Sequence, residues 1–441
     1  MKRVSWVALL LAVAFATALI IPPARAGEGK SKGAGDAVKS HALLLIDQGR
    51  ETFRFDTFGD EAFWGDTLKL HQAIAGSNLG GVGGGVSPRT ALAVGLKVDL
   101  DALPKELVAS LKAGDVNLDD PATTLALLKL NSVVGVKGIF DAKGGLVSMG
   151  ITCAFCHSTV DDAFIPGIGH RLDGWANRDL NVGAIASLAP NLDPVATRLH
   201  TDVETVKKVF ASWGPGRYDA ELLEDGKAFR PDGKTAATLL PPAFGLAGVN
   251  LHTYGGWGSV THWNAYVANT QMHGKGTFYD PRMNNPVKYP IAVENKDWDM
   301  RSTPDMVTSK LAALHFYQLA IPAPTAPHGS FDKNAAAHGE VIFNGKADCA
   351  KCHVPPLFTE PGWNMHKPGE IGIDDFQALR SPDEMYRTTP LKGLFSHQKG
   401  GFFHDGRFDT LLDVVNHYDS FFRLGLSDQE KRDLVEYLKS I

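Results

Sequence analysis

Two copies of one short motif constrain this chain more than any other feature. Residues 151–160 read ITCAFCHSTV, and residues 348–357 read DCAKCHVPPL. Each copy holds two cysteines separated by two residues, with a histidine directly after the second cysteine. The chain has four cysteines, and all of them belong to these two motifs. The residues concerned are Cys153, Cys156 and His157 in the first copy and Cys349, Cys352 and His353 in the second.

Three kinds of site use cysteines at this spacing. A zinc ribbon keeps its two cysteine pairs close in sequence, whereas these pairs begin at residues 153 and 349. A redox dithiol needs a βαβ unit, which the residues around 140–165 do not predict, and it has no use for the histidine. A covalently attached haem uses all three residues, because each thiol bonds a vinyl group and the imidazole binds the iron. The two motifs therefore predict two haem c groups.

The first 26 residues predict export. A short basic start is followed by the apolar run VSWVALLLAVAFATALII and by Ala24-Arg25-Ala26, which is typical of a signal peptide with its cleavage site. A retained membrane anchor is the alternative. Haem c is attached outside the cytoplasm in bacteria, so we expect a periplasmic protein. The formal net charge of −5 and the lack of a basic run argue against a nucleic-acid partner.

The remaining chain predicts a mainly α fold with two cytochrome c-like haem domains behind an N-terminal extension. We expect the extension at 27–140, the first haem domain at 141–320 and the second at 329–441. The boundary between the haem domains lies at IPAPTAPH, residues 321–328, whose three prolines cannot continue a helix.

Cap signals predict four helices in the two haem domains. The start of a helix is marked by a capping box or by Thr-Pro, and its end by glycine. The signals are Thr201 with Glu204 and Gly214 for the first helix, Thr303 with Pro304 for the second, Gly345 at the end of the third, and Ser427 with Glu430 for the last.

Several separated stretches resemble the bacterial di-haem cytochrome c peroxidase family, with its MauG-like and rubber-oxygenase-like relatives. AAAHGEVIFNGKADCAKCHVPPLFTEPGWN resembles the segment that contains the family's second haem motif. YRTTPLKGLFSHQKGGFFHDGRFDTLLDVVNHY resembles its Thr-Pro-Leu step and His-Asp-Gly signature, and PGIGHRLDGW is similar to the loop after the first haem. The resemblance covers about residues 150–441 and leaves 27–150 unexplained.

This resemblance implies a division of labour between the two haems. The first would react with hydrogen peroxide or dioxygen, and the second would exchange electrons with a small redox protein or a quinol-linked partner. Homodimers are common in the family. The alternative is an electron carrier in which both irons have six ligands and no reaction occurs.

The resemblance also implies candidates for the second axial ligand of each iron. His170 matches a family histidine that binds the first iron and moves away on activation, although a loop histidine bonded to the backbone is the alternative. Tyr418 lies fourteen residues after His404, where MauG-like proteins place a tyrosine ligand. The competing ligands for the second iron are His404, His417, Met365 and Met385.

Further roles follow from the same resemblance. The family uses a carboxylate to move protons at the first haem, but residues 251–276 contain none, so His262 and His273 are the candidates. Trp263 resembles the tryptophan that relays electrons between the haems, with Trp257 as the alternative. A calcium site between the domains is matched at Asn177 alone.

Overall fold

The computed structural model describes residues 32–397 and 399–441. The expected signal peptide, residues 1–26, lies outside the described residues. The chain divides into two units, residues 1–43 and 44–441. The described part of the first unit is the beginning of helix α1, Lys32–Phe55.

The prediction of a mainly α fold is confirmed, because helices outnumber strands along the described chain. None of the helices found between residues 32 and 441 has both the length and the apolar character needed to cross a bilayer. After α1 the helices are α2 Leu70–Ala75, α3 Pro88–Ala93, α4 Lys105–Ala113, α5 Pro121–Lys129, α6 Ala154–His157, α7 Val182–Ala186, α8 Asp193–Arg198, α9 Val203–Trp213, α10 Leu222–Asp225, α11 Val260–Tyr266, α12 Pro290–Asn295, α13 Leu311–Ala320, α14 Lys333–Asn344, α15 Phe376–Leu379, α16 Leu411–Phe422 and α17 Asp428–Ser440.

The strands of the described residues form small two-stranded sheets. The pair β2–β3 is a hairpin that leads directly into the first cysteine motif, and β4–β6 follows that motif. The pairs are β1 Val98–Asp99 with β5 Ile168–Gly169 in parallel, and, antiparallel, β2 Val136–Phe140 with β3 Leu146–Ile151, β4 Ser158–Val160 with β6 Arg171–Asp173, β7 Arg217–Tyr218 with β8 Thr238–Leu239, and β9 Thr277–Tyr279 with β10 Asp299–Arg301.

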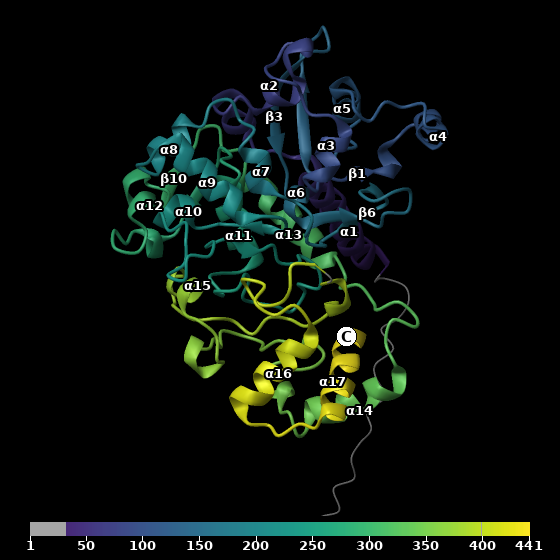
Figure 1. The fold of residues 1–441 in the computed structure, drawn as a ribbon, viewed down its shortest axis with the longest axis vertical. Helices are drawn as coiled ribbons and strands as arrows, with labels where there is room; N and C mark the ends of the chain where they lie inside the picture. Colours follow the sequence, from purple (N-terminus) through teal and green to yellow (C-terminus); the bar gives the residue numbers. More distant parts are fainter. Residues whose placement is uncertain (1–31, 398) are drawn as a thin grey trace, which may run out of the picture. The chain divides into compact units, whose positions relative to one another are not determined.

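The largest hydrophobic core joins the expected extension to the segment around the first cysteine motif. Trp64 and Leu128, which precede the motif, are buried in one cluster with Phe155, Leu180 and Phe210, which lie within it or follow it. Helix α2 packs against β3, α5 packs against β2, and α3 packs against α5, and Figure 1 shows these helices in the same part of the fold. Residues 64–140 therefore share their core with the residues that follow the first motif.

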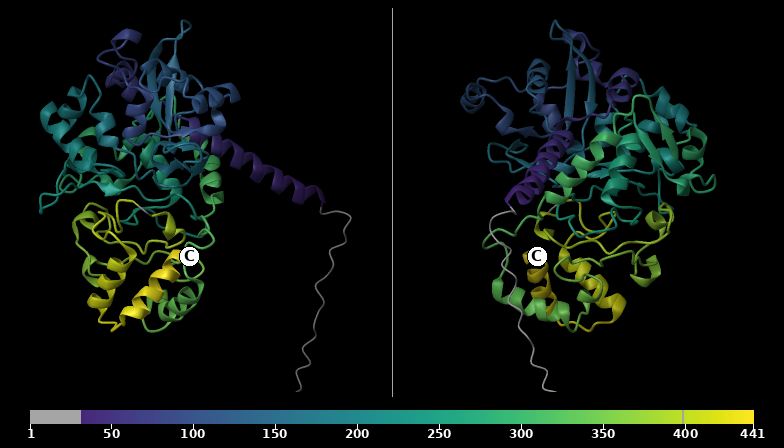
Figure 2. Two further views of the ribbon diagram at one scale, coloured as in Figure 1. Left: turned by 45° about the vertical axis from the view of Figure 1, so that its right-hand side comes forward. Right: turned by 180° about the vertical axis from the view of Figure 1, so that it is seen from behind.

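A smaller core surrounds the second cysteine motif. Helices α14, α16 and α17 bury Phe343, Val415 and Leu434 between them, and Cys349 packs against the edge of this cluster. The views of Figures 1 and 2 agree that these helices lie together. Gly339 allows α14 to approach α17 closely, because a Cβ at this position would lie 2.1 Å from the carbonyl oxygen of Asp433.

The helix ends were predicted with mixed success. Gly345 ends α14 and the capping box of Ser427 opens α17, as expected. The cap of α9 is Asp202, whose carboxylate accepts a bond from the Thr205 amide, so the prediction of Thr201 was wrong by one residue.

Helix α13 begins at Leu311, after the 3-10 turn η6 Thr308–Lys310, so the predicted start at Thr303 was also wrong. The Asp305 carboxylate accepts bonds from the amides of Val307 and Thr308. Such local side-chain bonds compete with a helix and account for the later start.

Candidate functional site

The first cysteine motif lies on the wall of a large cavity. Its empty volume is about 1460 Å³, part of it open to solvent, and Cys153, Cys156 and His157 line it. The rest of the wall is mainly apolar, with Trp64, Phe155, Val182, Leu239, Leu240, Pro241, Pro242, Leu246, Val260, Trp263, Val267 and Met272 among its residues.

The β2–β3 hairpin holds the motif against this cavity. The amide of Thr152 donates to the carbonyl of Gly135 at 3.0 Å, just before the single turn of α6. Gly135 has φ +76°, and a Cβ there would lie 2.2 Å from the backbone of Phe155. A side chain at Gly135 would therefore displace the turn that carries the two thiols.

Both motif histidines are oriented in the same way. Nδ1 of His157 lies 3.1 Å from the carbonyl oxygen of Pro241, and Nδ1 of His353 lies 3.1 Å from that of Phe358. With the proton on Nδ1, each ring keeps Nε2 for a metal. Burial lowers the pKa of His157 to about 4 and also lowers the pKa of His353, so both rings are neutral near pH 7.

The thiols fit covalent attachment better than the alternatives. Burial raises the pKa of Cys153 and of Cys156 to about 12, and that of Cys349 to about 11. Reactive redox cysteines have lowered pKa values. Among the described residues, no cluster of metal-binding side chains combines cysteines from both motifs, as a shared zinc site would require. An apolar cavity lined by both thiols and a neutral histidine fits a haem held by thioether bonds.

Glu221 supplies a carboxyl group on the cavity wall that sequence analysis missed. It lies just before α10, is 5% exposed, and its Oε1 accepts a hydrogen bond from the Gln377 amide at 3.1 Å. Its Oε2 is buried without a hydrogen-bond partner among the described residues. Burial raises the pKa of Glu221 to about 7, against the opposing charge of Arg380. This carboxyl group can therefore take up and release a proton near neutral pH.

Glu221 and two other buried carboxylates lie around one guanidinium group, that of Arg380. Nη2 of Arg380 lies 2.8 Å from Asp219, its Nε lies 2.7 Å from Asp225, and its Nη1 lies 4.0 Å from Glu221. The side chain of Arg380 is fully buried. Burial raises the pKa of Asp219 to about 6. One cation cannot balance three buried anions, so the cluster holds protons near neutral pH.

Four residues were expected to act at the first haem: His170, His262, Trp263 and His273. Of these, Trp263 lines the cavity. Its indole Nε1 is buried without a hydrogen-bond partner among the described residues, and the ring packs edge-on against Trp257 and Tyr266. Its neighbour His262 points elsewhere, with Nε2 3.0 Å from Asp280.

His273 and His170, the other two residues expected at the first haem, also lie outside the cavity wall. His273 stacks on Phe63 at 3.6 Å between ring centres, and burial lowers its pKa to about 3. The side chain of His170 is 52% exposed, and its Nδ1 lies 2.9 Å from Asp101. A different histidine, His252, lines the cavity.

Tyr418 lies near the second cysteine motif. Burial raises the pKa of its hydroxyl, and the Cys349 and Cys352 thiols add to this effect. The ring stacks on Phe422 within α16, at 5.7 Å between centres. The neighbouring His417 has a buried Nε2 without a hydrogen-bond partner among the described residues.

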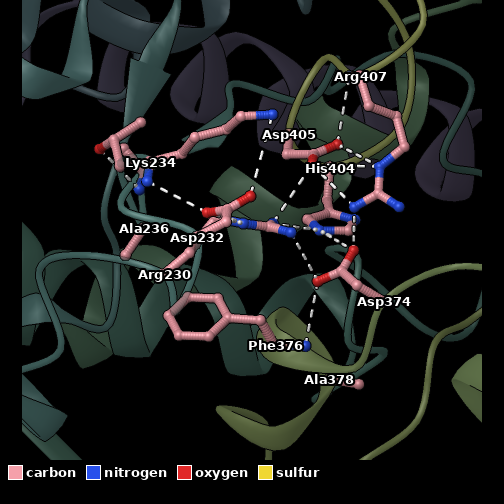
Figure 3. Close-up of polar contacts among 12 residues, drawn as sticks. Arg230, Asp232, Lys234, Ala236, Asp374, Phe376, Ala378, His404, Asp405 and Arg407 are labelled. Carbon is pink, nitrogen blue, oxygen red and sulfur yellow. Dashed lines mark hydrogen bonds and ion pairs between the residues drawn. The ribbon is translucent and has the colours of Figure 1, made fainter.

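His404 is part of an ion-pair network (Figure 3). It is 2% exposed, with Nε2 3.3 Å from Asp374 and 3.4 Å from Arg230. Its ring stacks on Tyr386. Asp405 and Arg407 complete the network.

Among the described residues, the clusters of histidine, cysteine and acidic side chains that could hold a metal ion do not include the neighbours of Asn177. Its side-chain amide donates to the Gly95 carbonyl at 2.9 Å, and its oxygen accepts a bond from the Asp179 amide. The oxygen-rich cluster of Asp374, His404 and Asp405 lies elsewhere, and the arginines within it oppose a cation. Calcium binding stays a prediction.

No protein-family model matches the chain. Two curated proteins are similar to parts of it. One is the methylamine utilization protein MauG of Methylorubrum extorquens, 27% identical over 30% of this chain and 43% of that protein. The other is hydrazine synthase subunit gamma of Kuenenia stuttgartiensis, 29% identical over 30% of this chain and 49% of that protein. The chain thus spans less than half of the length of either relative.

Two solved structures are also similar to the chain. Hydrazine synthase of Kuenenia stuttgartiensis pressurized with xenon gives 18% identity and a TM-score of 0.33, over 48% of this chain and 75% of the other. A MauG-like protein associated with microbial copper homeostasis gives 20% identity and a TM-score of 0.24, over 30% and 56%. The curated matches support a distant relationship to MauG-like di-haem proteins.

Proposed function

We propose that the chain is an exported di-haem c-type redox protein. Cys153 with Cys156 and Cys349 with Cys352 would each hold one haem through thioether bonds, and His157 and His353 would bind the irons. The haem supplies one-electron redox chemistry, and an iron with an open position binds a small oxidant. The distant similarity to MauG and the matched orientation of both histidines support this proposal.

We further propose that the first cavity is the reactive site and that hydrogen peroxide is the oxidant, with dioxygen as the alternative. The observation that carries this proposal is that Glu221 lines the same cavity as His157. Oε2 of ionised Glu221, which has no hydrogen-bond partner among the described residues, would accept a proton from hydrogen peroxide and return it to the leaving oxygen as the O–O bond breaks, so that water leaves. We assign this role to Glu221 rather than to His262 or His273, because neither histidine lines the cavity.

The second motif would exchange electrons with a small redox protein or a quinol-linked partner in the periplasm. Tyr418 is the proposed second ligand of its iron, because its hydroxyl lies near both thiols of the second motif. Trp263 is the proposed electron relay, since its indole lies on the wall of the first cavity.

The test is spectroscopy of the purified, exported protein. Mass spectrometry should find two attached haems, and electron-spin resonance should find one high-spin iron that changes when peroxide is added. Two low-spin irons that ignore peroxide would identify a di-haem electron carrier instead. A protein without attached haem would refute both functions.

A further inference from the structure

Three arginines surround Tyr254 next to the first cavity. They come from distant parts of the sequence and are called here the arginine cluster: Arg178, Arg217 and Arg387. Burial raises the pKa of Tyr254, and the positive charges of all three arginines oppose this effect. The hydroxyl of Tyr254 itself donates to the carbonyl of Leu239 at 3.1 Å. Tyr254 and Arg387 both line the first cavity.

No arginine of this cluster has a carboxylate partner among the described residues. Arg387 donates from Nε and Nη1 to the carbonyls of Thr253 and Leu251, and its Nη2 makes no hydrogen bond found among the described residues. The Nε of Arg178 is buried without a hydrogen-bond partner among the described residues. Arg217 donates to the backbone carbonyl of Asp405 at 3.2 Å.

The neighbouring arginines behave differently. Arg230 and Arg407 each pair with carboxylates, as Figure 3 shows, and Arg380 is surrounded by them. These three neighbours thus have the carboxylate partners that the arginine cluster lacks among the described residues.

Enclosed guanidinium groups without anions are costly. Burial lowers the pKa of Arg387 to about 10 and also lowers that of Arg178. A buried charge needs a paired charge, and a planar guanidinium pairs best with a carboxylate through two parallel hydrogen bonds. The anion that balances these arginines must therefore come from outside the described chain.

We propose that the arginine cluster binds the propionate carboxylates of the haem attached at Cys153 and Cys156, with Arg387 as the main contact. This inference rests on the proposed function. Each haem carries two propionates, and Arg387 lines the cavity that both cysteines face. The propionates would supply the missing negative charges, and the cluster would fix the rotation of the ring within the cavity.

The test uses the full-length exported holoprotein with Arg387→Gln, Arg387→Lys and Arg178→Gln. Arg432→Gln is the matched control, because Arg432 binds the Gln429 side chain on the exposed face of α17. Resonance Raman propionate-bending bands should shift in Arg387→Gln and Arg178→Gln and return toward wild type in Arg387→Lys. The midpoint potential of one haem should fall in both glutamine variants, because a nearby positive charge stabilises the reduced iron. The control should change neither property.

The outcomes separate this inference from the proposed function. Unchanged Raman bands in glutamine variants that carry two haems would refute the propionate site and leave the function standing. Loss of the first haem in both Arg387→Gln and Arg387→Lys would show a structural role instead and also refute it. A wild-type protein without haem would refute the function itself.

A free anion is the other source of negative charge for this cluster. Inorganic phosphate should therefore be added to the wild-type holoprotein while its thermal midpoint is followed. We expect phosphate to shift the thermal midpoint of the wild-type protein no more than it shifts that of Arg387→Gln at the same ionic strength. A stabilisation that wild type shows and Arg387→Gln lacks would mean that the cluster binds a free anion, which would overturn the assignment.

Discussion

The ring of His157 lies 3.1 Å through Nδ1 from the carbonyl oxygen of Pro241, which itself lines the first cavity. This contact fixes the ring before any cofactor is bound and directs its free nitrogen to a metal. The 3.1 Å contact of His353 with Phe358 repeats this arrangement in the second motif. Each cysteine pair is thus followed by a histidine whose ring is already oriented to bind a metal.

Removing one cysteine pair should remove one haem. We expect Cys153→Ala with Cys156→Ala to lower the mass of the exported protein by one haem relative to wild type, and Cys349→Ala with Cys352→Ala to do the same. Intact-mass spectrometry under denaturing conditions measures the covalent attachment. Each double variant is the control for the other, and a protein that keeps both haems in either variant would contradict the assignment.

Replacing Glu221 should slow peroxide reduction without loss of haem. Glu221→Gln keeps the shape of the side chain and its contact with Gln377 but cannot take up a proton. General acid–base catalysis typically contributes about 100- to 10,000-fold, so we expect a loss of this size in kcat/KM. The wild-type rate should rise as pH increases through about 7, and this rise should vanish in the variant.

The control for this prediction is Glu294→Gln, which removes a carboxylate from an exposed ion pair with His200. Its rate and pH profile should match those of wild type. Equal rates for Glu221→Gln and wild type at every pH would exclude a proton role for Glu221.

The same carboxyl group should make stability depend on pH. Its pKa is about 7 in the folded protein against 4.5 for an ordinary glutamate, so the folded state binds more protons between these values. The stabilisation is therefore complete below pH 4.5 and is lost as pH rises through 7, with a loss of about 3 kcal/mol. Denaturant unfolding at several pH values should show this slope, and Glu221→Gln should make it shallower, leaving the part that Asp219 contributes.

The cysteine motifs and several helices could be predicted from the sequence because local signals determine them. The capping box at Ser427 and the glycine that ends α14 depend on neighbours a few residues away, and the structure has both. The start of α13 could not be predicted in this way. The Asp305 side chain satisfies the amides that a helix would have used, and the cap signal at Thr303 does not reveal this competition.

The carboxyl group at the cavity could not be located because burial is a property of the folded chain. The expected stretch, residues 251–276, contains no acid, and the actual group follows β7. The run DAELLED at 219–225 did hint at a buried acidic cluster. It places four acids among leucines in a short stretch, and such acids need a shared cation if they are buried. That cation, Arg380, lies 159 residues after Glu221 in the sequence, so only the fold brings them together.

Tyr418 offers a test of the second motif alone. If its oxygen binds the second iron, Tyr418→Phe should change the spin state of one iron and raise its midpoint potential, because a tyrosinate stabilises oxidised iron. Electron-spin resonance and potentiometric titration measure these changes. Tyr437→Phe, in the core between α14 and α17, is the matched control and should leave both spectra as they are. Unaltered spectra for Tyr418→Phe would exclude Tyr418 as the ligand. The remaining candidates for the second iron would then be His417, His404, Met365 and Met385.

Replacing Arg380 should strongly reduce the stability of the fold. Its guanidinium binds Asp219 and Asp225 with both side chains fully shielded from solvent. Arg380→Met would leave these carboxylates without their cation, and removing one partner of a buried pair typically costs about 3–5 kcal/mol. We expect a loss of this size in the free energy of unfolding at pH 8, measured with denaturant.

The loss should shrink toward pH 5, because Asp219 and Glu221 then bind protons and need no cation. The control is Arg89→Met, whose ion pair with Asp119 is exposed and whose removal should leave the unfolding midpoint unchanged. A loss for Arg380→Met that is the same at pH 5 and pH 8 would point to lost packing rather than unbalanced charge. It would also remove the argument that this cluster stores protons beside the cavity.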